Sequence, residues 1–345
     1  MTNRARPRFR RSDALRRLAA ALALGGCATL AGEAGDLDAV RPNAQAGPFR
    51  LITQAELATG VAPNVLSSPS ARYREPSALA LGESLVGDVA LYAVAELGGQ
   101  SGIFRFRAPD ARTFGAEPPD AVLGATEDWE GGAIAEPEAA RVGAEIWLFY
   151  SAAGGIGLAR SADGLSFEKL PAPVLGAMAG TWEDGPPSSP GFVALAPGDY
   201  RLFYAVGSRI GEATSMDGIT WQRRPEPALE PSLQQDAFDS VAVGDPEPEL
   251  AKSAEGRSIL RVYYTGRGGN GTSGIGLAAR FRAPDPLARA TSPVLAGSRN
   301  PSHPALLRGP GLALLFVSAR AGSPSSQDFP AIALAVAPAT VVLPR

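Results

Sequence analysis

Apolar residues recur along most of this chain in short stretches of five to eight positions, several of which alternate with polar residues. Segments such as "YRLFYAV" (200–206) and "LRVYYTG" (260–266) show the pattern. Alternation over such lengths is typical of half-buried β-strands. No long stretch beyond the N-terminal segment has the 3.6-residue period of a helix, and 40 glycines and 31 prolines fit a chain that turns every few residues. The pattern therefore predicts an all-β protein.

One stretch of this pattern occurs twice with similar sequence. "IGLARSADGLSF" (156–167) is followed by "IGEATSMDGITW" (210–221). Each stretch belongs to a longer unit that begins with Trp-Glu and reaches a proline eight residues later, at Pro137 and Pro190. An alternating strand ending in Phe-Tyr follows the proline in both units. Such self-similarity at a fixed period indicates a repeat architecture.

Three weaker copies complete the series, starting near "REPSALAL", "FDSVAVGDPEPEL" and "NPSHPALL". Each unit contains four short strands, and five such units predict a five-bladed β-propeller with four antiparallel strands per blade. The propeller is expected over residues 67–345, with these approximate blade limits: 67–126, 127–179, 180–235, 236–297 and 298–345.

Turns and aromatic residues repeat at fixed blade positions. Asp163-Gly164 and Asp217-Gly218 are strong hairpin signals, since type I′ turns need positive φ at both central residues. Aromatic residues near these positions are expected to fill the space between blades. They are Phe114, Phe167 and Trp221, and the strand tyrosines Tyr150, Tyr204 and Tyr264 are expected in the core for the same reason.

The N-terminal segment indicates export. Residues 1–26 combine an arginine-rich start with the apolar run "LAAALALGG", which is too short to span a bilayer and suits a signal peptide. "LGGC" resembles the lipobox of bacterial lipoproteins, and Cys27 would be the lipidated residue. The alternative is an ordinary secretory signal with a chance cysteine. Residues 27–66 are expected to form a flexible tether, with "PFRLITQAEL" as a possible extra strand.

Composition narrows the partners. Cys27 is the only cysteine, so neither a disulfide nor a cysteine-based metal site is expected. Nucleic acid binds to basic surface patches, so the net charge of −3 argues against nucleic acid as a partner. We expect a monomer, lipid-anchored in the bacterial cell envelope at the outer membrane or the periplasmic face.

The second and third blade sequences, each with Trp-Glu, a strand-starting proline, Ile-Gly-x-Ala and Asp-Gly, resemble the five-bladed propeller glycosidases. These include arabinanases, β-xylosidases, invertases and levansucrases. The resemblance covers about residues 67–345 and implies that the residue before each strand-starting proline faces a central funnel. These residues are Glu75, Glu136, Ser189, Asp245, and either Asn300 or His303. Glycoside hydrolysis needs two carboxyl groups flanking one bond, which such a funnel could bring together.

The resemblance also implies roles. Glu75 would be the base or nucleophile, Asp245 or Glu247 the general acid, and Glu136 a neighbour that raises the pKa of that acid. Two positions depart from the family pattern, because Glu75 and Ser189 stand where aspartates are expected. The residues assigned to substrate binding are Arg74, Asp184, Ser189, Asn300 and His303.

Other acids repeat directly after the aromatic residue that opens a blade: Glu130, Glu183 and Asp239. Repetition at one offset favours a structural role, with the carboxylates pairing with backbone amides or arginines. His303, the single histidine, is a candidate ligand for an axial Ca²⁺, although no cofactor is required. The expected function is a membrane-anchored propeller that binds a glycan and, if active, hydrolyses it. The alternative is a catalytically inactive carbohydrate-binding or protein-interaction propeller in the envelope.

Overall fold

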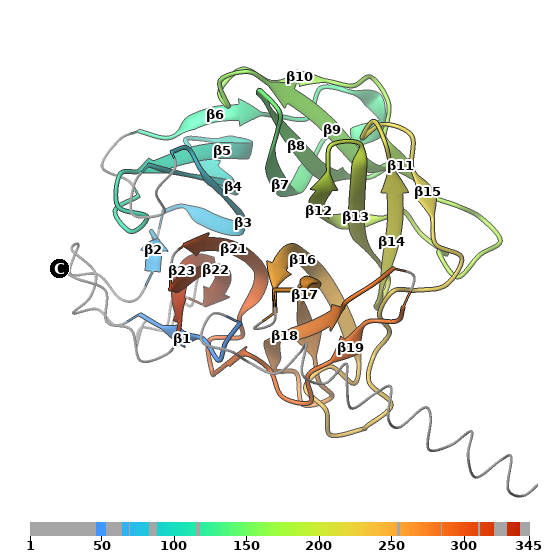
Figure 1. Cartoon of the computed structure of the whole chain (residues 1–345). Coiled ribbons are helices and arrows are strands. Elements are labelled where there is room, and N and C mark those ends of the chain that lie inside the picture. The colour runs from blue at the N-terminus through green and yellow to red at the C-terminus, as the bar shows by residue number, and fades with distance from the viewer. Residues whose placement is uncertain are drawn as a thin grey trace, which may run out of the picture.

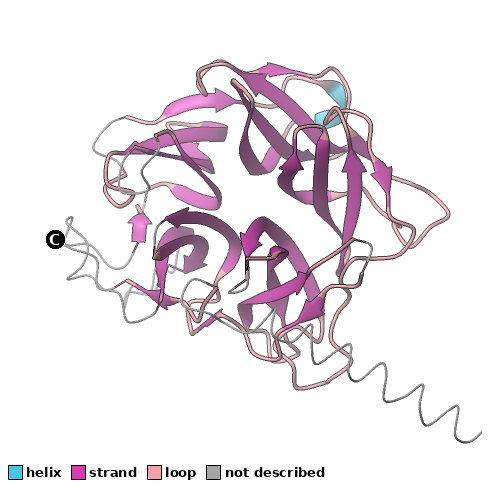
Figure 2. Ribbon diagram, viewed as in Figure 1, coloured by secondary structure: helices cyan, strands magenta, loops and turns pink. Residues whose placement is uncertain are grey.

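Five antiparallel sheets stand radially around a central axis, which confirms the predicted five-bladed β-propeller (Figure 1). The computed structural model describes residues 46–52, 64–68, 70–82, 88–114, 118–253, 256–283, 285–309, 311–320 and 330–338. The expected signal peptide, Cys27 and most of the tether lie outside these residues. The described part contains strands and one 3₁₀-helix, η2 (Asp128–Glu130) (Figure 2). It holds no helix with the length and apolar character needed to cross a membrane.

The first two blades show the common plan, in which the first strand is innermost and each later strand lies farther out. Blade one consists of β3 (Arg72–Ala80), β4 (Val89–Leu97), β5 (Gln100–Ala108) and β6 (Asp120–Leu123). Blade two consists of β7 (Ile134–Val142), β8 (Glu145–Ala152), β9 (Gly155–Ser161) and an outer edge split into β10 (Glu168–Lys169) and β11 (Leu175–Gly176).

The next two blades repeat this order. Blade three consists of β12 (Ser188–Ala196), β13 (Asp199–Val206), β14 (Arg209–Ser215) and β15 (Gln222–Arg223). Blade four consists of β16 (Ala242–Lys252), β17 (Ser258–Arg267), β18 (Ser273–Arg280) and the outer strands β19 (Ala288–Arg289) and β20 (Leu295–Ala296).

The fifth blade joins two distant parts of the chain. Its inner strands are β21 (Ser302–Gly309), β22 (Leu312–Arg320) and β23 (Pro330–Ala337). Its outer edge is formed by two strands from the N-terminal part of the chain. These are β1 (Arg50–Leu51) and β2 (Asn64–Leu66), which both pair with β23. The propeller therefore starts before residue 67, and the segment expected as a possible extra strand closes the ring.

The core lies between blades and is rich in aromatic side chains. Phe114 meets Phe316 of blade five, with ring centroids 5.7 Å apart. Phe167 meets Tyr92 of blade one at 5.9 Å, and Trp221 meets Phe149 of blade two at 6.2 Å. Each aromatic residue thus packs on the preceding blade, as the repeat predicted. Edge-on aromatic contacts of this kind add to the apolar area that the blades bury.

A tyrosine–carboxylate–cation set repeats in three blades. The tyrosine hydroxyl donates to the acid that follows the blade-opening aromatic residue, at 2.6–2.8 Å, and a cation from the outer strand pairs with the same acid. The three sets are Tyr150–Glu130–Lys169, Tyr204–Glu183–Arg223 and Tyr264–Asp239–Arg289. Through these contacts each acid attaches the segment that precedes its blade to the second strand and to the outer strand. This is the structural role expected for the three acids.

The Asp-Gly turns differ from the predicted type I′ geometry. Gly164 and Gly218 have φ of 73° and 76°, but the aspartates before them do not have positive φ. Each aspartate instead accepts hydrogen bonds from backbone amides two and three residues further on, at 2.8–2.9 Å. The side chain of the aspartate therefore shapes the turn, in the manner of an Asx-turn.

Candidate functional site

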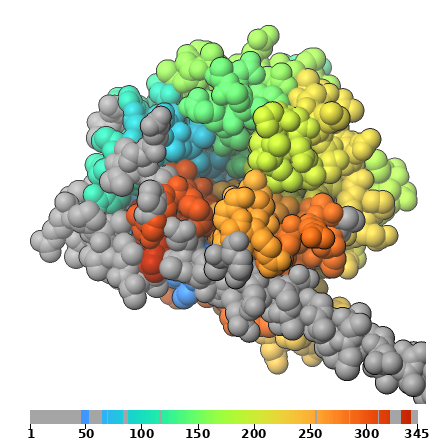
Figure 3. Space-filling model, in the orientation of Figure 1, coloured from blue at the N-terminus to red at the C-terminus, as the bar shows by residue number. Residues whose placement is uncertain are grey.

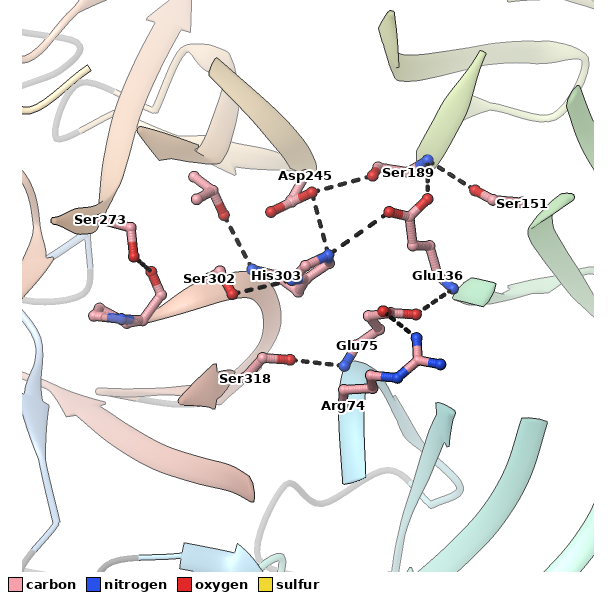
Figure 4. A network of polar contacts seen from close by, with 12 residues as sticks. Arg74, Glu75, Glu136, Ser151, Ser189, Asp245, Ser273, Ser302, His303 and Ser318 are labelled. Atoms are coloured by element: carbon pink, nitrogen blue, oxygen red, sulfur yellow. Dashed lines mark hydrogen bonds and ion pairs between the residues drawn. The ribbon is translucent and has the colours of Figure 1, made fainter. Parts of the chain in front are cut away.

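The innermost strand of every blade carries a non-glycine residue in the left-handed region, directly before a proline. These residues are Glu75, Glu136, Ser189, Asp245 and His303, with φ between 46° and 57°. A residue before proline is normally extended, and a left-handed non-glycine residue costs on the order of 1–3 kcal/mol. Each pair forms a β-bulge in the ladder to the second strand. Bulges redirect side chains, and here they turn five side chains towards the axis (Figure 4).

The bulge also decides the fifth position, which the sequence left open between two residues. His303 occupies it, because the register shift lies between Ser302 and Ala305. Asn300 also has positive φ, at 48°, but it precedes β21. Its backbone amide donates to the Gly297 carbonyl at 3.2 Å, so Asn300 belongs to the turn that enters the blade.

Hydrogen bonds link the five axial residues from blade to blade. The Glu75 carboxylate accepts from the Glu136 amide at 2.9 Å. The Glu136 carboxylate accepts from the Ser189 amide at 2.7 Å, and the Ser189 hydroxyl donates to Asp245 at 3.1 Å. Adjacent blades are therefore fastened together at the axis by the candidate site residues themselves.

Hydroxyl groups from the second strands support three of the axial backbone amides. Ser318 accepts from the Glu75 amide at 2.7 Å and Ser151 accepts from the Ser189 amide at 2.8 Å. Thr265 accepts from the His303 amide at 3.0 Å. Each hydroxyl comes from the preceding blade, so the strained backbone positions are held by their neighbours.

His303 joins two of the carboxylates. Its Nε2 lies 3.3 Å from Asp245 Oδ1 and 3.7 Å from Glu136 Oε1. Burial alone would lower the pKa of His303, but the charge of Asp245, the hydrogen bond with Glu136 and the charge of Glu75 raise that pKa to about 9. Although burial opposes it, contact with His303 lowers the pKa of Glu136 to about 2. At neutral pH the site therefore holds an imidazolium between carboxylates.

A second ring of residues lies in the innermost strands, two positions after each axial residue and on the same face of the strand. It consists of Ser77, Glu138, Gly191, Glu247 and Ala305. Glu138 accepts from the Ser77 hydroxyl at 3.1 Å, and Glu247 accepts from the Leu306 amide at 2.7 Å. Burial raises the pKa of Glu138 to about 8; burial and the nearby Glu138 raise that of Glu247 well above its usual range. Sequence reasoning missed Glu138, although the two-residue period of the strand after Glu136 could have indicated it.

The two rings enclose a cavity of about 30 Å³. Its lining comprises the five residue–proline pairs together with Glu138 and Glu247. A cavity of that volume holds one or two water-sized groups. The space-filling view shows the blades closing around a hollowed centre (Figure 3). The first ring, which consists of the five residues before the prolines, is the upper ring. Its side chains remain partly exposed, at 11% for Glu75 and 20% for His303.

Two further predicted residues lie outside this cavity lining. Arg74 pairs with Glu75 at 2.5 Å and is 35% exposed, so it stands beside the ring. Asp184 is exposed in the loop before β12. The structure thus brings together Glu75, Glu136, Ser189, Asp245, Glu247 and His303, and leaves Asp184 and Asn300 apart.

Glu136, Asp245 and His303 could contact a cation, because one ligand atom of each lies within 4.8 Å of the others. Within the part of the chain that the structure describes, Asp245 Oδ2 is buried and has no hydrogen-bond partner. Ca²⁺, however, takes six to eight oxygen ligands. The set supplies two carboxylates and one nitrogen, so most ligands would have to be waters, for which a cavity of about 30 Å³ has little room. The residues therefore fit Ca²⁺ poorly.

The architecture is shared with many solved structures. A putative glycoside hydrolase from Parabacteroides distasonis has a TM-score of 0.64 and 17% identity, over 86% of this chain and 97% of that one. The fold is that of the five-bladed glycoside hydrolases. No protein-family model matches the chain, and no curated protein does.

Other glycoside hydrolases share this propeller at similar distance. An endo-arabinase from Bacteroides thetaiotaomicron has a TM-score of 0.57 and 16% identity, over 79% of this chain and 96% of that one. A structure described with the GH130 mannoside phosphorylases and hydrolases has a TM-score of 0.59 and 16% identity, over 86% and 95%. At such identities the likeness to the glycoside-hydrolase propellers establishes the fold.

Proposed function

We propose that this glycoside-hydrolase-like propeller binds a glycan at the mouth of its axial cavity and does not cleave it. The polar upper ring supports binding, because Glu75, Glu136 and Asp245 supply acceptors and His303 supplies a charged donor, all partly exposed. The cavity of about 30 Å³ would accept a hydroxyl of the sugar, while the sugar ring stays above it.

The contact of His303 with both Glu136 and Asp245 is the observation that carries the proposal. One oxygen of each carboxylate lies within 4.8 Å of the other, with His303 Nε2 beside both. Hydrolysis requires two carboxyl groups on either side of a glycosidic bond. These two are instead joined by His303, so Asp245 is already engaged and only Glu247 remains as a candidate general acid for Glu75.

Binding and turnover should be measured together. Purified protein would be tested by calorimetry and by reducing-sugar release against an arabinan, xylan, fructan and mannan panel. We expect saturable binding of one oligosaccharide class without release of reducing sugar. Glu75→Gln should weaken binding about tenfold, the effect of losing one charge-assisted hydrogen bond. Asp184→Asn, distant from the ring, serves as the control. Absence of binding across the panel would reject the proposal.

Hydrolysis is the second candidate, and the raised pKa of Glu247 favours it. A carboxyl whose pKa lies well above its ordinary value suits a general acid, and Glu247 lines the same cavity as Glu75, the candidate base. If the protein hydrolyses the glycan, Glu247→Gln would lower the rate of reducing-sugar release at least 100-fold and leave binding intact. Turnover that survives both Glu75→Gln and Glu247→Gln would rule out this assignment.

We also propose that the chain is an exported lipoprotein anchored through Cys27, with the propeller on the outer-membrane or periplasmic side. The arginine-rich start, the apolar run and the single cysteine support this. Mass spectrometry of the mature protein should find a lipidated N-terminal cysteine. Cys27→Ala should move the protein from the membrane fraction to the soluble fraction. An unmodified Cys27 would refute the anchor.

A further inference from the structure

Blades three and four are neighbours in the ring (Figure 1). A basic pocket is lined by residues from the outer part of blade three and from the end of the third strand of blade four. Its volume is about 200 Å³. The lining contains four arginines and one carboxylate, with small polar or apolar residues between them: Arg201, Arg223, Arg224, Arg280, Glu212, Thr214, Gln222 and Ala283.

Glu212 is the centre of this cluster and is shared by three guanidinium groups. Arg280, only 2% exposed, donates to both of its oxygens, with the Nη1–Oε2 distance at 2.8 Å. Arg201 Nε and Arg224 Nη1 lie 3.9 and 3.7 Å from the same carboxylate, beyond hydrogen-bonding distance. Both of those nitrogens are buried and have no hydrogen-bond partner among the described residues.

Positive charge exceeds negative charge around the pocket. Arg223 is paired with Glu183, and Arg201 with Asp199 on its other side. Glu212 then remains as the single carboxylate for both Arg224 and Arg280. Arg224 is 27% exposed and makes no side-chain hydrogen bond with any described residue, so its guanidinium is available to a ligand that enters from solvent.

We propose that this pocket binds a small oxyanion, with Arg224 as the main ligand and Arg201 and Arg280 supplying the positive field. A guanidinium presents parallel donors that match the oxygens of phosphate, sulfate or a carboxylate. The bound anion would offset the surplus charge between the two blades. The site is independent of the glycan proposed at the axis.

The experiment measures the effect of anions on the full mature protein. Phosphate, sulfate and glucuronate would each be titrated by calorimetry and by thermal unfolding, against chloride at equal ionic strength. We expect one of the three to bind saturably and to raise the melting temperature, because a ligand that binds the folded state stabilises it. Preference for phosphate or sulfate would indicate a tetrahedral ligand, and preference for glucuronate a carboxylate.

Variants assign the effect to the pocket. Arg224→Gln should weaken binding about tenfold or more, since it removes a charged donor, while Arg224→Lys keeps the charge and should retain part of the affinity. Arg209→Gln is the matched control, because Arg209 pairs with Glu230 at 3.1 Å in the same blade and does not line the pocket. No saturable anion binding, or equal binding by Arg224→Gln and Arg209→Gln, would overturn the proposal.

Discussion

At the scale of single residues, one backbone position repeated in five blades determines what the axis of the molecule can do. The left-handed residue before each proline is Glu, Glu, Ser, Asp and His in turn. The same bulge geometry therefore presents three carboxylates, one hydroxyl and one imidazole to a shared space. Chemistry at this axis is set by residue identity, because the backbone is the same in every blade.

The pH dependence of stability should report the imidazolium. The pKa of His303 is raised to about 9 in the folded protein, above its ordinary value of 6.5. Its contribution is therefore complete below about pH 6.5 and is lost as the pH rises through 9, by on the order of 2–3 kcal/mol. Urea unfolding between pH 6 and 9.5 with a chelator present would compare the wild type with His303→Gln.

The measured quantity is the difference in unfolding free energy between the wild type and His303→Gln, because Glu138 also titrates near pH 8 in the folded state. The stability advantage of the wild type should shrink as the pH rises. If the difference stays constant over this range, His303 is not an imidazolium in the folded protein.

At the scale of elements, the Asp-Gly turns of blades two and three each pack against the preceding blade. The Tyr92 hydroxyl of blade one donates to the Gly164 carbonyl at 2.9 Å. In the next blade the turn at Gly218 lies against the Trp147 ring so closely that a Cβ would overlap it. Glycine is thus required twice over, for its positive φ and for this close approach.

A pair of glycine variants separates these two requirements. Gly143 also has positive φ, at 62°, but a Cβ there would meet nothing within 4 Å. Gly143→Ala should cost about 1–2 kcal/mol for the left-handed backbone alone. Gly218→Ala should cost at least about 2 kcal/mol more, because the Trp147 ring must move. Chemical denaturation of both variants measures the difference, and equal costs would contradict the interlocking role of the turn.

At the scale of the whole molecule, the ring is closed by a strand from the other end of the chain. β1 pairs with β23, and Ile52 extends this contact by donating its amide to the Leu334 carbonyl at 3.0 Å. Phe49 and Ile52 are 6% and 1% exposed and belong to the clusters on either side of blade five. Closure therefore buries apolar surface as well as pairing the exposed edge of blade five.

Truncation tests this closure. A chain of residues 67–345, which contains all five innermost strands, lacks β1 and β2. It should unfold at a clearly lower temperature than residues 28–345 and bind a hydrophobic dye, because Leu334, Val336 and their neighbours lose their cover. Equal melting temperatures for the two chains would show that the N-terminal strands do not close the propeller.

The repeat, the strands, the five blades and the aromatic packing between them could be predicted from the order of residues alone. These features depend on local alternation and on a period within the chain, so they are readable without coordinates. The proline spacing together with the family resemblance also predicted four axial residues, and the bulge that presents each of them is a local feature of its strand. The turn type was predicted wrongly, since Asp163 and Asp217 use their side chains where the dipeptide alone indicated a backbone-only turn.

Which of these groups come together depends on how the blades pack. The proximity of Glu138 to Glu247 and the pairing of β1 with β23 join residues far apart in the chain, and the choice of His303 over Asn300 follows from the register between β21 and β22. The protonation of His303 and of the buried glutamates follows from those encounters, because burial and neighbouring charge set a pKa and neither is written in local sequence.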